Sequence, residues 1–318
     1  MLKNKNAEGQ AEKRTEVVFY FEKHQLPYLK FLEEYVRRNK PDVIVLERPH
    51  EELFYDMLKG KISVKAYMEN THFQHSNPAF SKKKYELLGE LYGEGVRVEP
   101  MLAEAVDELR SRLSRLRYLA AFQSELSITG RDFENAVSGR MDFARLLGVE
   151  GRLRDMRRTV ELAERIKNGE LKGKILVVVG SAHTESKNLL EKEFSKSDNV
   201  SISFVYPFRD MVADMFQGAS EVYPPGVELA RAYGQEHSKE KEICSRERKR
   251  LLGARDLIYS LISKDLQSSR GDELRNYEAV RAVNKLGYED CKRMFEMIVK
   301  NDMSRKEAFD FVQEYVRR

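Results

Sequence analysis

Histidine and glutamate side chains stand at the ends of four of the five apolar segments that read as strands. In chain order they are Glu22, His24, Glu47, Glu99 and His183. An imidazole can take a proton from water, and a neighbouring carboxylate can orient it or share a metal ion. These residue types can therefore serve as partners for one another or form a site with shifted pKa values, provided that the fold brings them together.

Five short apolar runs must position these side chains. They span residues 16–21, 41–47, 96–99, 175–180 and 200–206. Apolar runs separated by helical stretches predict a mostly parallel α/β sheet flanked by helices. In such a sheet the carboxyl ends of the strands meet at one edge, where ligands bind. Gly180 gives the fourth run an exit that tolerates positive φ or a close backbone approach.

Each of these side chains also has a structural interpretation when it is taken alone. A histidine after a strand is more often a hydrogen-bonding partner, and a glutamate there more often begins a helix or pairs with a cation. Their joint occurrence at four strand ends favours a site. His72 and His75, in HFQH, have the spacing of a helical metal pair, but Asn77 and its neighbours indicate a loop. His237 lies in a charged stretch and is expected to face solvent.

The chain divides into three parts by composition. Residues 1–14 are polar and predict a loose arm, and residues 15–216 predict the α/β domain. Within that domain, residues 51–95 and 101–169 are expected to be largely helical segments that cover the sheet. After a turn-rich break, residues 227–318 predict an all-helical appendage, which covers the sheet, pairs subunits, or does both.

Several helices are predicted within these parts. Helical periodicity indicates helices over residues 25–39, 101–122, 156–169, 239–265, 272–299 and 303–316. In the second of these, one apolar seam is formed by Leu102, Val106, Leu109, Leu113, Leu116 and Ala120. Gly169 is expected to end the third helix.

Composition excludes several classes of function. The 318 residues are 41% hydrophobic and 34% charged, with a net charge of +4, and the charges of both signs alternate. This pattern predicts a globular core and no nucleic-acid partner. We expect no signal peptide, no membrane span, a cytoplasmic location, and buried thiols at Cys244 and Cys291. Dinucleotide, P-loop, zincin and serine-esterase motifs do not occur.

The stretches VVVGSAH and PDVIVLE resemble the TraB/PrgY–Tiki superfamily, which includes erythromycin esterases and ChaN-like haem-binding proteins. That group has two GxxH motifs, a glutamate that ends the second strand, and an arginine on a helix before the last motif. Gly180 and His183 match the second GxxH. His24 matches the first histidine, with Phe21 in the place of the glycine. Glu47 matches the glutamate.

The arginine of the family matches Arg158, in RTVELAERI, 25 positions before His183. Arg154 and Arg157 are the alternatives if the register shifts. The esterase branch carries a glutamate one position away from Glu22. The resemblance covers roughly residues 16–206 and leaves the helical tail outside.

The resemblance implies a hydrolase that cleaves an ester or amide bond in a small molecule or peptide. His24 or His183 takes a proton from water, Glu47 orients the imidazole or shares a metal, and Arg158 stabilises the oxyanion. If a divalent metal ion takes part, His24, Glu47 and His183 supply two imidazoles and one carboxylate. Glu22, Glu99 and Gly180 would support the site.

Two other classes of function stay open. The same pocket could hold haem or another ligand in a binding or regulatory protein. Alternatively, the helical tail could carry the function in an interaction protein, where it would also join subunits into a homo-oligomer.

Overall fold

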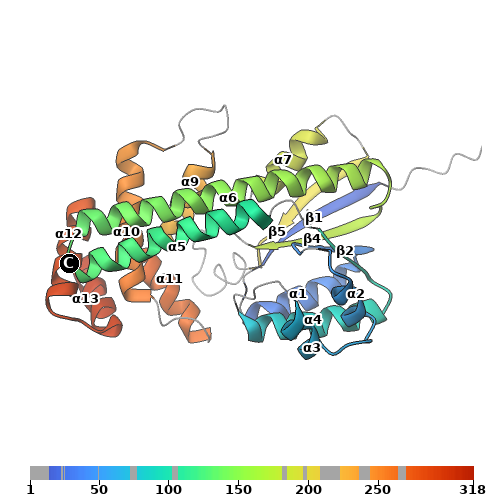
Figure 1. The fold of residues 1–318 in the computed structure, drawn as a ribbon, viewed down its shortest axis with the longest axis horizontal. Coiled ribbons are helices and arrows are strands. Elements are labelled where there is room, and N and C mark those ends of the chain that lie inside the picture. The colour runs from blue at the N-terminus through green and yellow to red at the C-terminus, as the bar shows by residue number, and fades with distance from the viewer. Residues whose placement is uncertain are drawn as a thin grey trace, which may run out of the picture.

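The structure, a computed structural model, confirms the predicted fold class: a parallel sheet flanked by helices, followed by a helical C-terminal region (Figure 1). The residues that it describes are 14–22, 24, 26–48, 50–71, 77–101, 107–180, 185–195, 199–207, 223–235, 244–263 and 270–318. The predicted N-terminal arm lies outside the described residues except for Arg14.

The sheet contains the five strands that the apolar runs predicted. They are β1 (Thr15–Glu22), β2 (Val43–Leu46), β3 (Arg97–Pro100), β4 (Lys174–Gly180) and β5 (Val200–Val205). All neighbouring strands are parallel, in the order β3-β2-β4-β1-β5. The carboxyl ends therefore share one edge, and β4 separates β1 from β2. Glu22 pairs with Gly180 at this edge.

Side-chain alternation along the strands divides the core into two layers. Tyr20 and Leu46 pack toward α1 (Leu26–Asn39) and α4 (Pro78–Gly93), whereas Phe19 and Val45 pack in the opposite layer. That second layer is covered by the C-terminal part of α6 (Phe133–Lys167) and by α7 (Glu185–Glu193).

Residues 51–95 form regular helices although their apolar residues show no strong period. They contain α2 (Glu52–Leu58), α3 (Val64–Asn70) and α4. Capping explains where two of these helices begin: Ser63 accepts a hydrogen bond from the backbone N–H of Ala66, and Asn77 accepts one from Phe80. In the sequence these helices lie between β2 and β3, and they supply much of the core layer that contains Tyr20 and Leu46.

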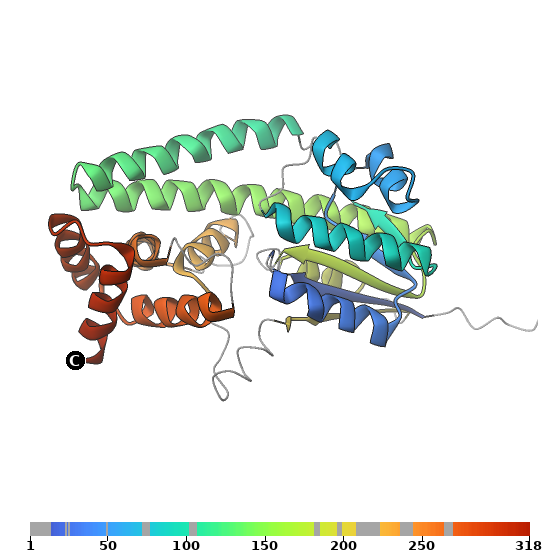
Figure 2. The ribbon, with the colours of Figure 1, turned by 90° about the horizontal axis from the view of Figure 1, so that it is seen from below.

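Helix α6 is much longer than its sequence pattern indicated. It runs for 35 residues and carries the predicted helix 156–169 in its C-terminal part. The helix ends at Lys167, and Gly169 adopts a φ of 72°, as expected for a glycine that closes a helix. Together with α5 (Asp107–Thr129) it forms a long antiparallel pair that extends from the sheet to the helical region (Figure 2).

The predicted apolar seam of α5 is only partly buried. Leu113 and Ala120 are buried, but Leu116 is 49% exposed. The reason is that α5 packs extensively on α6 alone among the described elements, and one partner covers only one side of a helix. Leu102 and Val106 lie outside the described residues, as does the side chain of Leu109.

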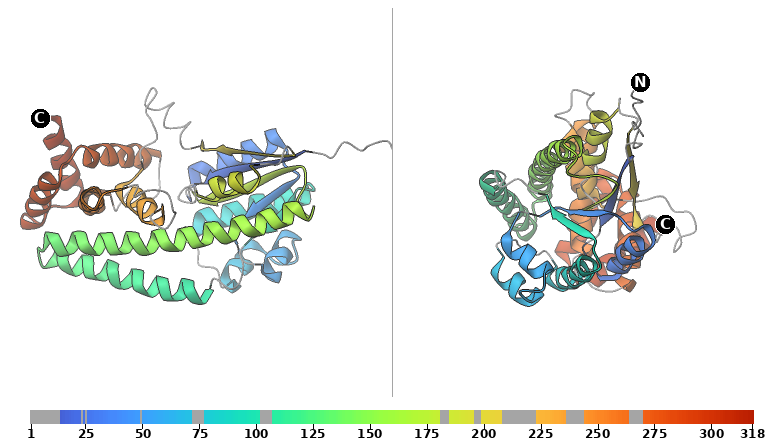
Figure 3. Two further views of the ribbon diagram at one scale, coloured as in Figure 1. Left: turned by 90° about the horizontal axis from the view of Figure 1, so that it is seen from above. Right: turned by 90° about the vertical axis from the view of Figure 1, so that its right-hand side faces the viewer.

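The C-terminal region, called here the helical lobe, contains five described helices (Figure 3). They are α9 (Pro225–Gln235), α10 (Arg246–Ser263), α11 (Arg270–Asn284), α12 (Tyr288–Lys300) and α13 (Arg305–Arg317). The single helix predicted over 272–299 is wrong, because the chain turns at 285–287 and Gly287 begins α12. The prediction also missed α9, whereas α13 confirms the predicted helix 303–316.

Helix α6 joins the two lobes by packing in both. Phe133, Ala136 and Val137 at its start are buried in the core of the helical lobe. At Gly148 the helix meets α9 so closely that an added Cβ atom would collide with the carbonyl oxygen of Ala230. Within the part of the chain that the structure describes, no helix is long and apolar enough to cross a membrane.

Candidate functional site

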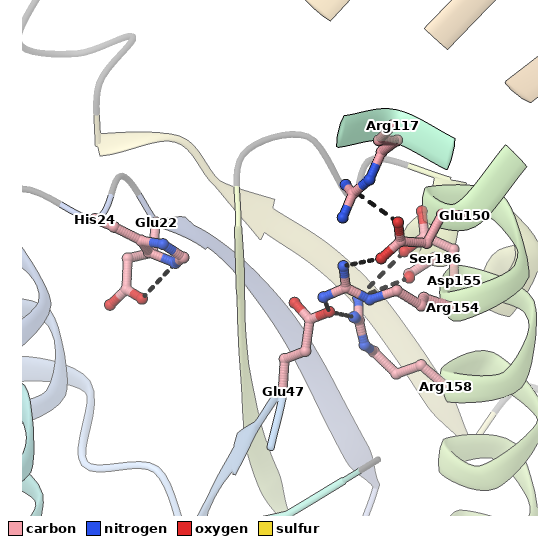
Figure 4. A network of polar contacts seen from close by, with 9 residues as sticks. All are labelled: Glu22, His24, Glu47, Arg117, Glu150, Arg154, Asp155, Arg158 and Ser186. Carbon is pink, nitrogen blue, oxygen red and sulfur yellow. Dashed lines mark hydrogen bonds and ion pairs between the residues drawn. The ribbon is translucent and has the colours of Figure 1, made fainter. Parts of the chain in front are cut away.

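Glu47 leaves the carboxyl end of β2 and points into a group of polar side chains on α6 (Figure 4). Its Oε1 lies 2.6 Å from Nη2 of Arg158 and also contacts Nη2 of Arg154. The Glu47 side chain is only 13% exposed. Two guanidinium groups therefore compensate this carboxylate where water reaches it poorly.

The contacts of Glu47 extend into a larger set, called here the Glu47 cluster. Its members are Glu47, Arg117, Glu150, Arg154, Asp155, Arg158 and Ser186. Arg158 Nη1 lies 3.3 Å from Asp155 and donates to Ser186 Oγ at 3.2 Å. Glu150 lies 3.5 Å from Arg154 and 3.1 Å from Arg117. Three carboxylates thus balance three guanidinium groups.

Helical spacing explains why these residues meet. Glu150, Arg154 and Arg158 are four positions apart on α6, which places them along one face of the helix. Arg157, the alternative in the neighbouring register, has an exposed side chain on another face. The cluster therefore selects Arg154 and Arg158 as the arginines beside Glu47.

The two arginines differ in their access to solvent. The side chain of Arg158 is 3% exposed and contacts Glu47, Asp155 and Ser186. The side chain of Arg154 is 21% exposed. Arg158 is thus placed to hold Glu47, and Arg154 is the more exposed of the two arginine side chains.

His24 lies two residues beyond β1 and contacts a different carboxylate. Its Nε2 lies 3.6 Å from Oε2 of Glu22, whose side chain is 4% exposed, and Lys84 Nζ lies 2.5 Å from the same oxygen. The His24 ring stacks on Phe80 with centroids 5.6 Å apart. Its carbonyl oxygen accepts a hydrogen bond from Asn77. The start of α4 therefore supports an imidazole that is half exposed.

The predicted convergence at the sheet edge is only partial. Figure 4 shows Glu22 and His24 apart from the Glu47 cluster. Because β4 lies between β1 and β2, the two strands are separated by about 10 Å. Glu22 also follows Tyr20 in the α4 layer, whereas Glu47 follows Val45 in the α6 layer. Glu22, rather than Glu47, is the carboxylate beside His24.

Arg48 is a buried cation at this edge that sequence reasoning missed. Its guanidinium lies 5.1, 5.0 and 4.6 Å from the ring centroids of Phe54, Tyr67 and Tyr85. Burial raises the pKa of Tyr67 to about 12 and also raises that of Tyr85, so both rings stay neutral beside Arg48. Because side chains alternate along a strand, the sequence could have placed Arg48 on the face of the sheet opposite Glu47. No signal in the sequence identified Lys84 as the partner of Glu22.

Two other residues singled out in the sequence have structural partners. Glu99 pairs with Arg165 at 3.0 Å and with Arg97 at 2.7 Å. Glu99 pairs in the sheet with Val45 of the neighbouring strand, and Val45 lies two residues before Glu47. Phe21, which stands in the place of the family glycine, is 2% exposed and stacks on Tyr206 with centroids 4.2 Å apart.

The proposed metal ligands are not assembled by the residues described. His183 lies outside them, as do His72, His75 and His237, and His24 lies apart from Glu47. No group of three or more His, Cys, Asp or Glu side chains that could hold a metal ion occurs within the described ranges. Because two guanidinium groups already engage Glu47, its surroundings do not fit a divalent cation.

Comparison with known proteins finds a distant relative. An uncharacterised protein of Archaeoglobus fulgidus is 28% identical over 272 residues, which cover 80% of this chain and 88% of the relative. No family model and no solved structure matches the chain.

Proposed function

We propose that this protein is a hydrolase of ester or amide bonds, as its resemblance to the TraB/PrgY–Tiki superfamily implies. The observation that carries the proposal is the Glu47 pair with Arg154 and Arg158 at the carboxyl edge of a parallel sheet. This edge is where ligands bind in such sheets. A partly exposed arginine side chain held there, that of Arg154, supplies a fixed positive charge.

In the proposed reaction, a histidine removes a proton from water as the water oxygen attacks the carbonyl carbon. His24 and His183 are the two candidates for this base. The carbonyl oxygen becomes negatively charged, and Arg154 stabilises that charge. When the tetrahedral intermediate collapses, the C–O or C–N bond breaks and the protonated imidazole returns its proton to the leaving group.

The supporting residues follow from the contacts described above. Glu22 would hold the imidazole of His24, and Lys84 would hold the buried carboxylate of Glu22 in place. Arg158 would position Glu47, and Glu47 would in turn fix the guanidinium of Arg154. No step is assigned to a metal ion, because the surroundings of Glu47 do not fit one.

The test is hydrolysis of a panel of small esters and peptides by the wild type and four variants. His24→Ala and His183→Ala identify the base, whose loss should lower kcat by about 10²- to 10⁴-fold. Arg154→Met should lower kcat by about 10²- to 10³-fold. Glu99→Gln is the control, because Glu99 has the same 13% exposure and an α6 arginine partner. Absence of turnover by the wild type, or full activity in both histidine variants, would contradict the proposal.

A further inference from the structure

Helix α5 has two faces, and the described segments of the chain cover only one of them. Leu113, Ala120 and Ser124 are buried, and Ser124 donates a hydrogen bond to the carbonyl oxygen of Ala136 on α6. Arg117, on the same side, pairs with Glu150 of α6. Figure 2 shows α5 at the outside of the molecule, with α6 between it and the helical lobe.

The other face of α5 is apolar and exposed. Its large apolar side chains, with their exposed fractions, are Leu116 (49%), Tyr118 (69%), Leu119 (58%), Phe122 (51%) and Leu126 (57%). The Tyr118 and Phe122 rings stack on each other with centroids 6.3 Å apart. Apolar groups gathered in this way mark an interaction surface, whereas single exposed apolar residues do not.

This face has the spacing of a coiled-coil seam. Arg112, Leu119 and Leu126 recur every seven residues, and Arg115 and Phe122 lie between them. Such 3-4 spacing places all five side chains along one line of the helix. The whole helix is about 35 Å long. The seam is basic in its first half and apolar in its second half.

We propose that α5 joins two copies of this chain into a two-fold symmetric dimer, with the two α5 helices antiparallel. In a parallel pair, Arg112 would face Arg112 of the second copy and Arg115 would face Arg115, so like charges would meet. An antiparallel pair places Leu119 against Phe122 of the second copy, and Arg115 beside Leu126 and Glu125 of the second copy. Each contact then occurs twice, and opposite charges meet at both ends of the seam.

Exposure also favours this face over the helical lobe as the dimer contact. Among the described residues of α9 to α13, Met297 is the one large apolar side chain that is strongly exposed, at 39%. Glu125 is 58% exposed and keeps its own ion pair with Arg140 at 3.3 Å, so a second cation can still reach it. This inference does not depend on the proposed hydrolase activity.

The test is a charge exchange read by light scattering coupled to size exclusion. The wild type should have twice the 37.1 kDa mass of one chain. Arg115→Glu and Glu125→Lys each oppose like charges in an antiparallel homodimer and should raise its dissociation constant about tenfold or more. Mixing the two variants should restore a dimer, because each mutant charge then meets its opposite.

Two single variants control for folding and for the choice of surface. Leu119→Glu should give a folded monomer by circular dichroism, and Met297→Glu on α12 should leave the dimer intact. The proposal is overturned if the wild type is monomeric at its highest soluble concentration, or if Met297→Glu alone dissociates it. If the mixture of Arg115→Glu and Glu125→Lys stays monomeric, the antiparallel pairing is excluded. If the wild type binds anionic lipid vesicles as a monomer, the exposed face of α5 is a membrane contact instead.

Discussion

Nη2 of Arg158 lies 2.6 Å from Oε1 of Glu47, and this contact ties helix α6 to the carboxyl end of β2. Arg158 is buried and Glu47 is nearly so. Each charge offsets much of the cost of burying the other, because an ion in a protein interior is stable only when it is paired. The pair therefore links the sheet to the helix that spans both lobes.

Replacing Glu47 by glutamine should lower both stability and activity. The free energy of unfolding in urea should fall by about 3–5 kcal/mol, because Arg158 loses its closest carboxylate while it stays buried. Glu99→Gln breaks a pair with Arg165 in which both side chains are 13% exposed; it should also destabilise the protein, but it should leave kcat unchanged. A Glu47→Gln variant with wild-type kcat would remove this carboxylate from the proposed mechanism.

Lys84 should contribute far more to stability than its neighbour Lys83. Lys84→Met leaves Glu22 buried without its closest cation and should cost about 3–5 kcal/mol of unfolding free energy. Lys83 is 62% exposed and pairs with Glu86 one turn along the same helix, so Lys83→Met should change stability by less than about 0.5 kcal/mol. Chemical denaturation of both variants tests the difference, and equal values would show that Glu22 does not need Lys84.

Two glycines on α6 should respond in opposite ways to substitution by alanine. At Gly148 the new methyl group would collide with the backbone of α9, so Gly148→Ala should lower the melting temperature and loosen the packing of α9. At Gly151 no heavy atom lies within 4 Å of an added Cβ, so Gly151→Ala should stabilise the helix by about 0.5–1 kcal/mol. Thermal unfolding measures both. A harmless Gly148→Ala would mean that the two helices do not cross so closely.

Asp290 makes the stability of the helical lobe depend on pH. Hydrogen bonds from the Tyr315 hydroxyl, 2.5 Å away, and from the Gly287 backbone N–H hold the pKa of Asp290 below its ordinary value of 3.8. A depressed folded-state pKa stabilises the folded protein above about pH 4, and this contribution is lost as the pH falls through that pKa. Tyr315→Phe should therefore destabilise the lobe at pH 7, and the difference from wild type should shrink in acid. A difference that is constant from pH 7 to pH 2 would contradict this linkage.

Most of the architecture could be predicted from the sequence because its signals are local. Short apolar runs such as 175–180, separated by helical stretches, predict strands of a parallel sheet, and residues such as Glu47 directly follow them. The length of α6 could not be predicted in the same way. Its first half is stabilised by packing against the helical lobe, which leaves no single amphipathic period in the sequence.

The sequence by itself determined which side chains stand at the carboxyl edge of the sheet, and it placed Arg158 on a helix before His183. Only the tertiary structure decided which of these side chains meet. Strand order places β4 between β1 and β2, and alternation turns Glu22 and Glu47 toward opposite layers. Both depend on contacts between distant segments. One pattern of strand ends therefore resolves into two groups, His24 with Glu22 and Glu47 with two arginines.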